Sequence, residues 1–179
     1  MPTMSTFSGR KPDPMNIDSR EICPEDIAHA LSLLCRGGGH LLRFYSVGQH
    51  SLNCMKEAQA RGWSRRVQFA CLMHDAREAY LSDVIGAGKA HFPLDAEAGR
   101  NAMARIRETF GLLDLNEEEN RQWKQIDDDM LEYELKHLMP GESERKIPPL
   151  RSCPDLSERP WREVEAEFYE ALRRFQDSL

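Results

Sequence analysis

No run of about 18 consecutive apolar residues, the length of a membrane-spanning helix, occurs in the sequence. The N-terminal stretch MPTMSTFSGRKPDP also lacks the apolar segment of a secretory leader. Both absences predict a protein that is neither exported nor membrane-bound. The net charge of −6 disfavours binding to nucleic-acid polymers, which would need a basic surface. A small anionic substrate is still compatible, because a metal ion and a few arginines can make one site positive.

Cysteine motifs are also missing. The five cysteines are an odd number, and no two of them form a C-x-x-C pair. Several lie in apolar, helical-looking stretches, as expected of reduced core residues. They are Cys23, Cys35, Cys54, Cys71 and Cys153. This usage predicts a cytoplasmic protein without disulfides or a structural zinc site.

The chain shows no alternating pattern of β-strands and no internal repeat. Apolar residues recur at helical spacing, and 179 residues with 40% hydrophobic content are enough for one domain with its own core. We therefore predict an all-α, single-domain helical bundle over residues 24–179, after an N-terminal arm or short hairpin over residues 1–23. The helices expected lie at about 24–35, 47–61, 64–82, 95–110, 117–139 and from 159 onward.

Capping residues and glycines set several of these boundaries. Pro24 suits the first turn of a helix, and the glycines at 37–39 end that helix. Ser64 and Asn116 are predicted N-caps. The stretch 140–160 is long, polar and proline-bearing, which is typical of a functional loop, an assembly contact or a mobile segment.

The adjacent pair His74 and Asp75 is the most informative feature. On a helix with about 100° per residue, the pair shares one arc with Glu78, and the rest of that helix is apolar on nearly every side. Burying an imidazole and a carboxylate together costs several kcal/mol unless they pair or bind a metal. A His-Asp dipeptide is common by chance, so the metal interpretation depends on further ligands.

Periodicity supplies two further ligands. His50 points inward on the preceding helix; one inward histidine is usually a core residue, but two on consecutive helices favour a shared ion. In the next acidic run, Asp127 falls in the middle of an apolar stripe. Asp128 and Asp129 fall on the polar flank and fit a solvated surface. We predict four metal ligands, which are His50, His74, Asp75 and Asp127.

Two imidazole nitrogens and two carboxylate oxygens suit one divalent transition metal (Mn, Co, Fe, Ni or Zn) better than Mg, which prefers oxygen ligands alone. Four protein ligands would complete a tetrahedral zinc site. An octahedral ion would keep two positions for water and substrate.

The order H…HD…D, with HDAREAYLSD at its centre, resembles the HD-domain phosphohydrolases. The segments EDIAHALSLLCR, GHLLRFYSVGQHS and LMHDAREAYLSD resemble, more narrowly, their small bacterial and phage 5′-deoxynucleotidase-like branch, over about residues 6–137. The resemblance implies a helical bundle, hydrolysis of nucleoside phosphates, and the same four metal ligands. It also implies catalytic roles for Glu78 and Asp83, and a homo-oligomer.

The chain departs from that family at two places. Gly37 and Gly38 stand where an aromatic and a polar residue are usual, beside the expected substrate pocket. After Asp83, VIGAGK replaces the family's I-P-x-P-L-K, although Lys89 keeps the positive charge. These departures concern the shape of the pocket and therefore the choice of substrate.

The predicted reaction is hydrolysis of deoxyribonucleoside 5′-monophosphates to nucleoside and phosphate. Alternatives are a dNTP triphosphohydrolase that releases triphosphate, and a non-catalytic, metal-containing nucleotide sensor. Asp83 would orient the attacking water and Glu78 would protonate the leaving oxygen. Arg36 and Lys89 are expected to contact phosphate.

The sugar–base side of the pocket has three candidates, which are His40, Tyr45 and Gln49. Two candidates have plain structural alternatives. Arg36 could be a charge at a helix C-terminus, and Tyr45 could be ordinary core packing.

The last helix has an apolar stripe that is compatible with two roles. The stripe comprises Trp161, Val164, Phe168, Leu172 and Phe175. It could close the core of its own domain. Because the resembled enzymes are often homo-oligomers, we predict a dimer or higher oligomer with this region and residues 140–160 at or near the interface.

Overall fold

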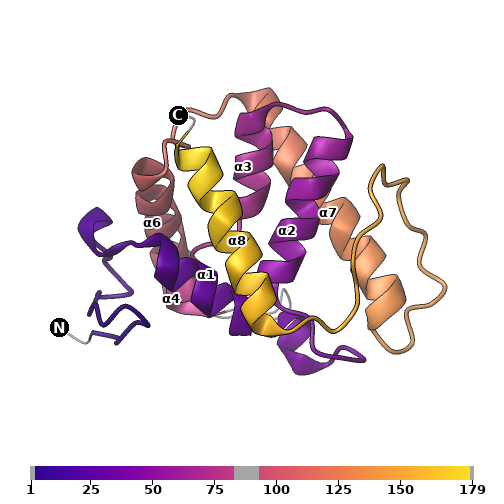
Figure 1. Ribbon diagram of the computed structural model, residues 1–179, viewed down its shortest axis with the longest axis horizontal. Coiled ribbons are helices and arrows are strands. Elements are labelled where there is room, and N and C mark those ends of the chain that lie inside the picture. The colour runs from indigo at the N-terminus through magenta and orange to yellow at the C-terminus, as the bar shows by residue number, and fades with distance from the viewer. Residues whose placement is uncertain (1–2, 83–92, 178–179) are drawn as a thin grey trace.

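The computed structural model describes residues 3–82 and 93–177 (Figure 1). Within this part the regular structure is helical, and the one β-type pairing is an isolated bridge between Cys35 and Ser46. The prediction of an all-α domain is confirmed. The main helices are α1 (Pro24–Leu33), α2 (Val47–Ala60), α3 (Arg65–Met73), α4 (Glu78–Leu81), α6 (Pro93–Thr109), α7 (Glu117–Leu138) and α8 (Trp161–Gln176). Two 3-10 turns, η1 (Ser19–Glu21) and η2 (Arg36–Gly39), flank α1.

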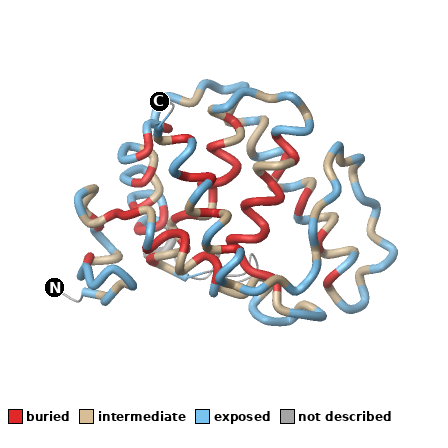
Figure 2. Tube along the Cα trace, viewed as in Figure 1, coloured by how far each residue is buried: buried red, intermediate tan, exposed pale blue. Residues whose placement is uncertain are grey.

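Helices α2 and α3 form the centre of the molecule (Figure 2). Ten of the 14 residues of α2 and six of the nine of α3 are buried, so both are covered on nearly every side. Helices α1 and α8 pack against one face, and α7 packs against α2 and α3 on another (Figure 1). Gly48 lets α1 approach α2 closely, because a Cβ there would lie 3.1 Å from the carbonyl oxygen of Leu31.

A small separate core holds α7 in place. It consists of Cys54, Ala58, Val67, Cys71, Ile126 and Met130, which come from α2, α3 and α7. Partly buried Trp123 and Leu150 pack against it. This core fixes the distances between α2, α3 and α7. Helices α2 and α7 each carry a predicted metal ligand, and α3 ends directly before His74.

The helix predicted over residues 64–82 is interrupted. This corrects the prediction, from helical periodicity, that Glu78 lies on the same arc as His74. Helix α3 ends at Met73, residues 74–77 form a turn, and α4 begins at Glu78. The His74 ring explains the break: its Nδ1 donates to the carbonyl oxygen of Cys71 at 2.7 Å. In a continuous helix that oxygen would accept the backbone N–H of Asp75. The turn instead closes with N–H donation from Glu78 to the Asp75 carbonyl.

The predicted N-caps at Ser64 and Asn116 are confirmed. Ser64 Oγ accepts the N–H of Val67 at 3.2 Å. Asn116 and Glu119 form a reciprocal capping box at the start of α7, with distances of 2.9 and 3.0 Å. Helix α6 begins at Pro93, two residues before the predicted start. Among the described helices, none is long and apolar enough to cross a membrane.

The N-terminal arm has the turned-back form of a short hairpin. The N–H of Met4 donates to Pro12 O at 3.0 Å, and the N–H of Thr6 donates to Arg10 O at 3.1 Å. Ser8 fixes the arm on α1 by donating its N–H and its hydroxyl to Asp26, at 2.6 and 2.8 Å.

The apolar stripe of α8 closes the core of this chain, which overturns the argument that placed it at an interface. Val164, Phe168, Leu172 and Phe175 are all buried, and α8 packs on α1, α2 and α3. The oligomer itself stays a prediction, and the apolar stripe of α8 does not support it.

Residues 139–160 follow an irregular path but are tied to α2. Glu57, which is fully buried, accepts backbone N–H groups from Arg151 and Ser152 at 2.9 and 2.8 Å. Arg61 also donates to Glu57, at 2.7 Å. Burial raises the pKa of Glu57, but these hydrogen bonds outweigh it and lower the pKa overall.

The charge of Glu57 should therefore stabilise the fold in a pH-dependent way. Because its pKa is lower in the folded state, this stabilisation is present above the ordinary glutamate pKa and is lost as the pH falls through the folded value. We expect Glu57→Gln to destabilise the protein at pH 7 by about 1.5 to 3 kcal/mol, with a smaller difference near pH 3. Urea unfolding at both pH values measures this, with exposed Glu144→Gln as control. An equal loss at both pH values would contradict the role of the charge.

Candidate metal centre

The structure brings together the four predicted ligands from three parts of the chain. His50 comes from α2, His74 and Asp75 follow α3, and Asp127 comes from α7. His50 Nε2 lies 3.1 Å from His74 Nε2 and 3.4 Å from Asp127 Oδ1. His74 Nε2 lies 3.2 Å from Asp75 Oδ2 and 3.5 Å from Asp127 Oδ1. Donor atoms about 2.1 Å from one ion lie about 3 to 3.5 Å apart, so these spacings suit a shared ion.

The site opens on the side of the carboxylates. The His50 side chain is fully buried and that of His74 is 3% exposed, whereas Asp75 is 15% and Asp127 26% exposed. Asp127 lies at the edge of the buried face of α7, not in the middle of it as predicted, because the fully buried positions are Ile126 and Met130. Because exposure rises from the histidines to Asp127, a bound molecule can reach the centre from the Asp127 side.

The hydrogen bonds of the two histidines fix which ring nitrogen faces the centre. His74 Nδ1 donates to a carbonyl oxygen, and His50 Nδ1 donates to Glu134 Oε1 at 2.7 Å. A neutral imidazole carries one proton, so both Nε2 atoms present lone pairs to each other and to the carboxylates of Asp75 and Asp127. Four electron-rich atoms thus converge with no hydrogen-bond donor among them. Such a set requires a positive charge, either a metal ion or an added proton.

The pKa values of His74, Asp75 and Asp127 reflect the same need for a positive charge. Burial lowers the pKa of His74, but the carboxylates of Asp75 and Asp127 outweigh it and raise that pKa well above its usual range. Burial raises the pKa of both carboxyl groups, but the histidines outweigh it and hold each pKa well below its usual range. The carboxylates are therefore ionised at neutral pH and available as ligands.

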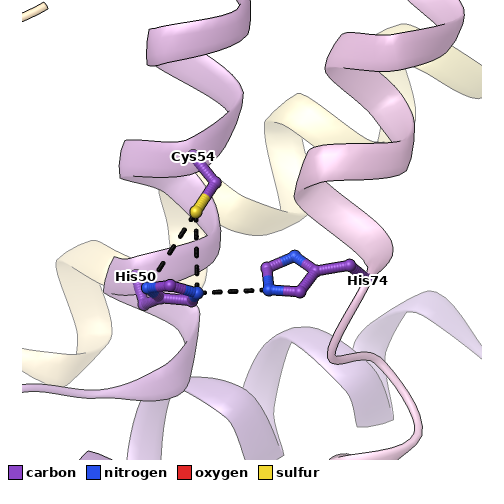
Figure 3. Close-up of side chains that lie close together, drawn as sticks. All are labelled: His50, Cys54 and His74. Atoms are coloured by element: carbon purple, nitrogen blue, oxygen red, sulfur yellow. Dashed lines mark hydrogen bonds between the residues drawn. The ribbon is translucent and has the colours of Figure 1, made fainter. Parts of the chain in front are cut away.

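Cys54 lies beside the two histidines, and the buried group of His50, Cys54 and His74 could hold a metal ion (Figure 3). The Cys54 sulfur is 3.5 Å from Nε2 and 3.9 Å from Nδ1 of His50. Nearly equal distances place it beside the ring, whereas a co-ligand of an ion on Nε2 should lie beyond that nitrogen. Burial also raises the pKa of Cys54 well above its usual range, so the thiol keeps its proton. The ionised carboxylates are the better placed donors.

Glu134 is a member of the site that the sequence analysis missed. It is buried on α7, and its two oxygens bind His50 Nδ1 at 2.7 Å and Arg36 Nε at 3.1 Å. The Tyr45 hydroxyl donates to the same oxygen as His50, at 2.7 Å. Helical periodicity could have predicted its burial, since Glu134 lies one helical turn after the buried Met130. A glutamate at that spacing needs partners inside the protein.

The predicted substrate contacts have different outcomes. Arg36 bridges Glu134 and Asp75, the latter at 3.3 Å, so it is part of the site and not a simple helix-terminal charge. Tyr45 is fully buried and bonded to Glu134, which corrects its assignment to the sugar–base side and matches the core-packing alternative. Gln49 is likewise buried and donates to the carbonyl oxygens of Asp155 and Ser157.

The remaining predicted residues are His40, Glu78, Asp83 and Lys89. His40 is exposed in the turn after η2. Glu78 is 4% exposed at the start of α4, four residues after His74. Asp83 and Lys89 lie outside the described residues.

No family model matches the chain, which is similar to two uncharacterized bacterial proteins. The uncharacterized protein YfdR of Escherichia coli is 38% identical over 112 residues, which cover 63% of this chain and 60% of YfdR. An uncharacterized protein of Rhodobacter capsulatus is 38% identical over 99 residues, half of each chain. The chain thus spans 50 to 60% of the length of these relatives. Its activity has to be inferred from the site.

Proposed function

We propose that the protein is a metal-dependent phosphohydrolase of the HD-domain type, acting on deoxyribonucleoside 5′-monophosphates. The observation that carries the proposal is the convergence of four electron-rich atoms from His50, His74, Asp75 and Asp127 within 3.9 Å of His50 or His74 Nε2. The order of these residues in the chain is that of the H…HD…D motif. A divalent transition metal (Mn, Co, Fe, Ni or Zn) suits two imidazoles and two carboxylates.

The residues around the centre suit hydrolysis of a phosphate ester. When bound, the ion supplies Lewis-acid activation of a phosphoryl group and of water. Arg36 holds Asp75 in place, and 13% of its side chain is exposed. Glu78 is buried and close in sequence to the ligands, and it is proposed as the general acid. Asp83 is proposed to orient the attacking water.

A nucleotide panel tests this function. The full chain is incubated with Mn, Co, Fe, Ni or Zn and with deoxyribonucleoside mono-, di- and triphosphates, and the products are identified. Release of inorganic phosphate from the monophosphates is expected. Release of intact triphosphate would make it a triphosphohydrolase instead, and tight nucleotide binding without turnover would make it a sensor. A protein that takes up none of the metals would contradict the whole proposal.

Replacing Glu78 should separate catalysis from metal binding. We expect Glu78→Gln to keep the fold and a full metal content, because its carboxylate is not among the four converging donors. Turnover should fall by about two to four orders of magnitude, the usual effect of losing a general acid or base. Elemental analysis and single-turnover rates measure the two properties. Near-normal turnover would reassign Glu78 to a structural role.

A further inference from the structure

Arg107, near the end of α6, has a half-buried guanidinium with no acidic partner in the described part of the chain. Its Cζ lies 5.7 Å from the centre of the Trp123 ring, over the face of the indole. Burial lowers the pKa of Arg107, and no neighbouring acid raises it again. The indole gives this cation a favourable surface but does not neutralise it.

Most other half-buried arginines of the described chain are neutralised, Arg77 being the exception. Five of them each contact two acidic side chains, and these are Arg36, Arg61, Arg66, Arg145 and Arg159. The chain has 30 acidic residues against 24 lysines and arginines, so acidic partners are not scarce. A partly desolvated cation without a partner is unfavourable for stability alone. Arg107 therefore has the properties of a group that meets its anion when a ligand binds.

Trp123 contacts both Arg107 and the His74 ring of the metal centre. It precedes Asp127 by one turn of α7, and its ring centre lies 6.0 Å from that of His74. Asp127 is the most exposed of the four predicted ligands, so the approach to the centre lies on this side. Lys124 adds a second positive charge there, with Nζ 3.5 Å from Asp127 Oδ2.

We propose that Arg107, whose guanidinium carbon lies over the Trp123 ring, binds a phosphate group of the substrate at the entrance to the metal centre. The cation–π contact with the indole uses none of the guanidinium N–H groups, which are left for phosphate oxygens, and arginine binds these in bidentate fashion. The identity of the ligand rests on the proposed function, whereas the need for an anion rests on Arg107 and its surroundings alone. Arg107 is thus a substrate-binding residue that the sequence pattern of metal ligands does not reveal.

The test compares Arg107→Gln with Arg105→Gln in the full, metal-loaded chain. Arg105 is a matched control because it lies on the same helix, is 55% exposed, and is already paired with Glu108. Calorimetry and tryptophan emission give the Kd for inorganic phosphate, and kinetics give KM and kcat for the best nucleotide of the panel. For Arg107→Gln we expect Kd and KM to rise about tenfold or more, with kcat changed less than about threefold. Arg105→Gln should behave like the parent.

The melting temperature distinguishes binding from a structural role. Because Arg107 is desolvated without a partner, Arg107→Gln should melt no lower than the parent, and Arg107→Lys should keep part of the phosphate affinity. A lower melting temperature with unchanged Kd and KM would overturn the inference. Normal turnover with an unchanged KM would also overturn it and leave the proposed function standing. Arg107-dependent phosphate binding without hydrolysis of any phosphate ester would support the inference about Arg107 and contradict the proposed function.

Discussion

His74→Ala is expected to abolish metal binding and turnover together. His74 contributes the Nε2 atom that lies within 3.5 Å of donor atoms from His50, Asp75 and Asp127, so its loss removes the ligand that all the others share. Elemental analysis of the purified variant should find less than about a tenth of an equivalent of metal, because losing one of four ligands weakens an ion strongly. A full equivalent of metal in this variant would refute the assignment of the centre.

Thermal unfolding supplies a second measurement that does not depend on activity. A ligand at about 100 times its Kd stabilises the folded state by about 2.7 kcal/mol. Added metal should therefore raise the melting temperature of the chelator-treated parent and leave that of His74→Ala unchanged. His137→Ala is the control, because His137 is exposed and should keep the full metal response. A parent that shows no response to any of the five metals would contradict the proposed cofactor.

Asp127 and its neighbour Asp128 allow a matched comparison. Asp127 lies 3.4 Å from His50 Nε2, whereas Asp128 is 60% exposed and binds Lys124. Asp127→Asn should lose the metal response and Asp128→Asn should keep it. The reverse result would place the ligand one position further along α7.

Much of the fold was predictable because its determinants are local. The caps at Ser64 and Asn116 depend on side chains that bind backbone groups within three residues, and such signals are visible in the sequence. The break after Met73 was not predictable in the same way. It depends on a hydrogen bond from the His74 ring to Cys71 O, and the position of that ring depends on packing against other helices.

The metal ligands were predictable because periodicity shows which polar residues face inward. The partners of those residues were not, since they come from distant parts of the chain. Tyr45 and Gln49 also face inward, but Glu134 occupies the Tyr45 hydroxyl and the backbone at 155 and 157 occupies the Gln49 amide nitrogen. Glu134 was not predicted, although its spacing of one helical turn from Met130 marks it as buried.

Glu134 should control the affinity of the metal centre without touching the ion. By accepting the hydrogen bond from His50 Nδ1–H, it keeps the Nε2 lone pair directed at the other ligands. Burial raises the pKa of Glu134, but His50 and Arg36 outweigh it and lower the pKa, so the group is a carboxylate at neutral pH. The same carboxylate holds Arg36, which also contacts Asp75. One side chain thus orients two of the four predicted ligands.

Glu134→Gln is therefore expected to weaken metal binding by about 10 to 100-fold, the usual cost of losing such an orienting partner. The amide can still accept from His50 but presents an N–H group to Arg36, which loses its carboxylate partner there. Competition with a chelator measures the Kd of Mn or Zn, and turnover is then measured at saturating metal. Because Glu134 acts through His50 and Arg36, kcat should recover largely when the centre is refilled. Tyr45→Phe, which removes a neutral donor to the same oxygen, should change the metal Kd much less. An unchanged Kd in Glu134→Gln, or lost turnover with the centre fully loaded, would show that Glu134 does not act by positioning the ligands.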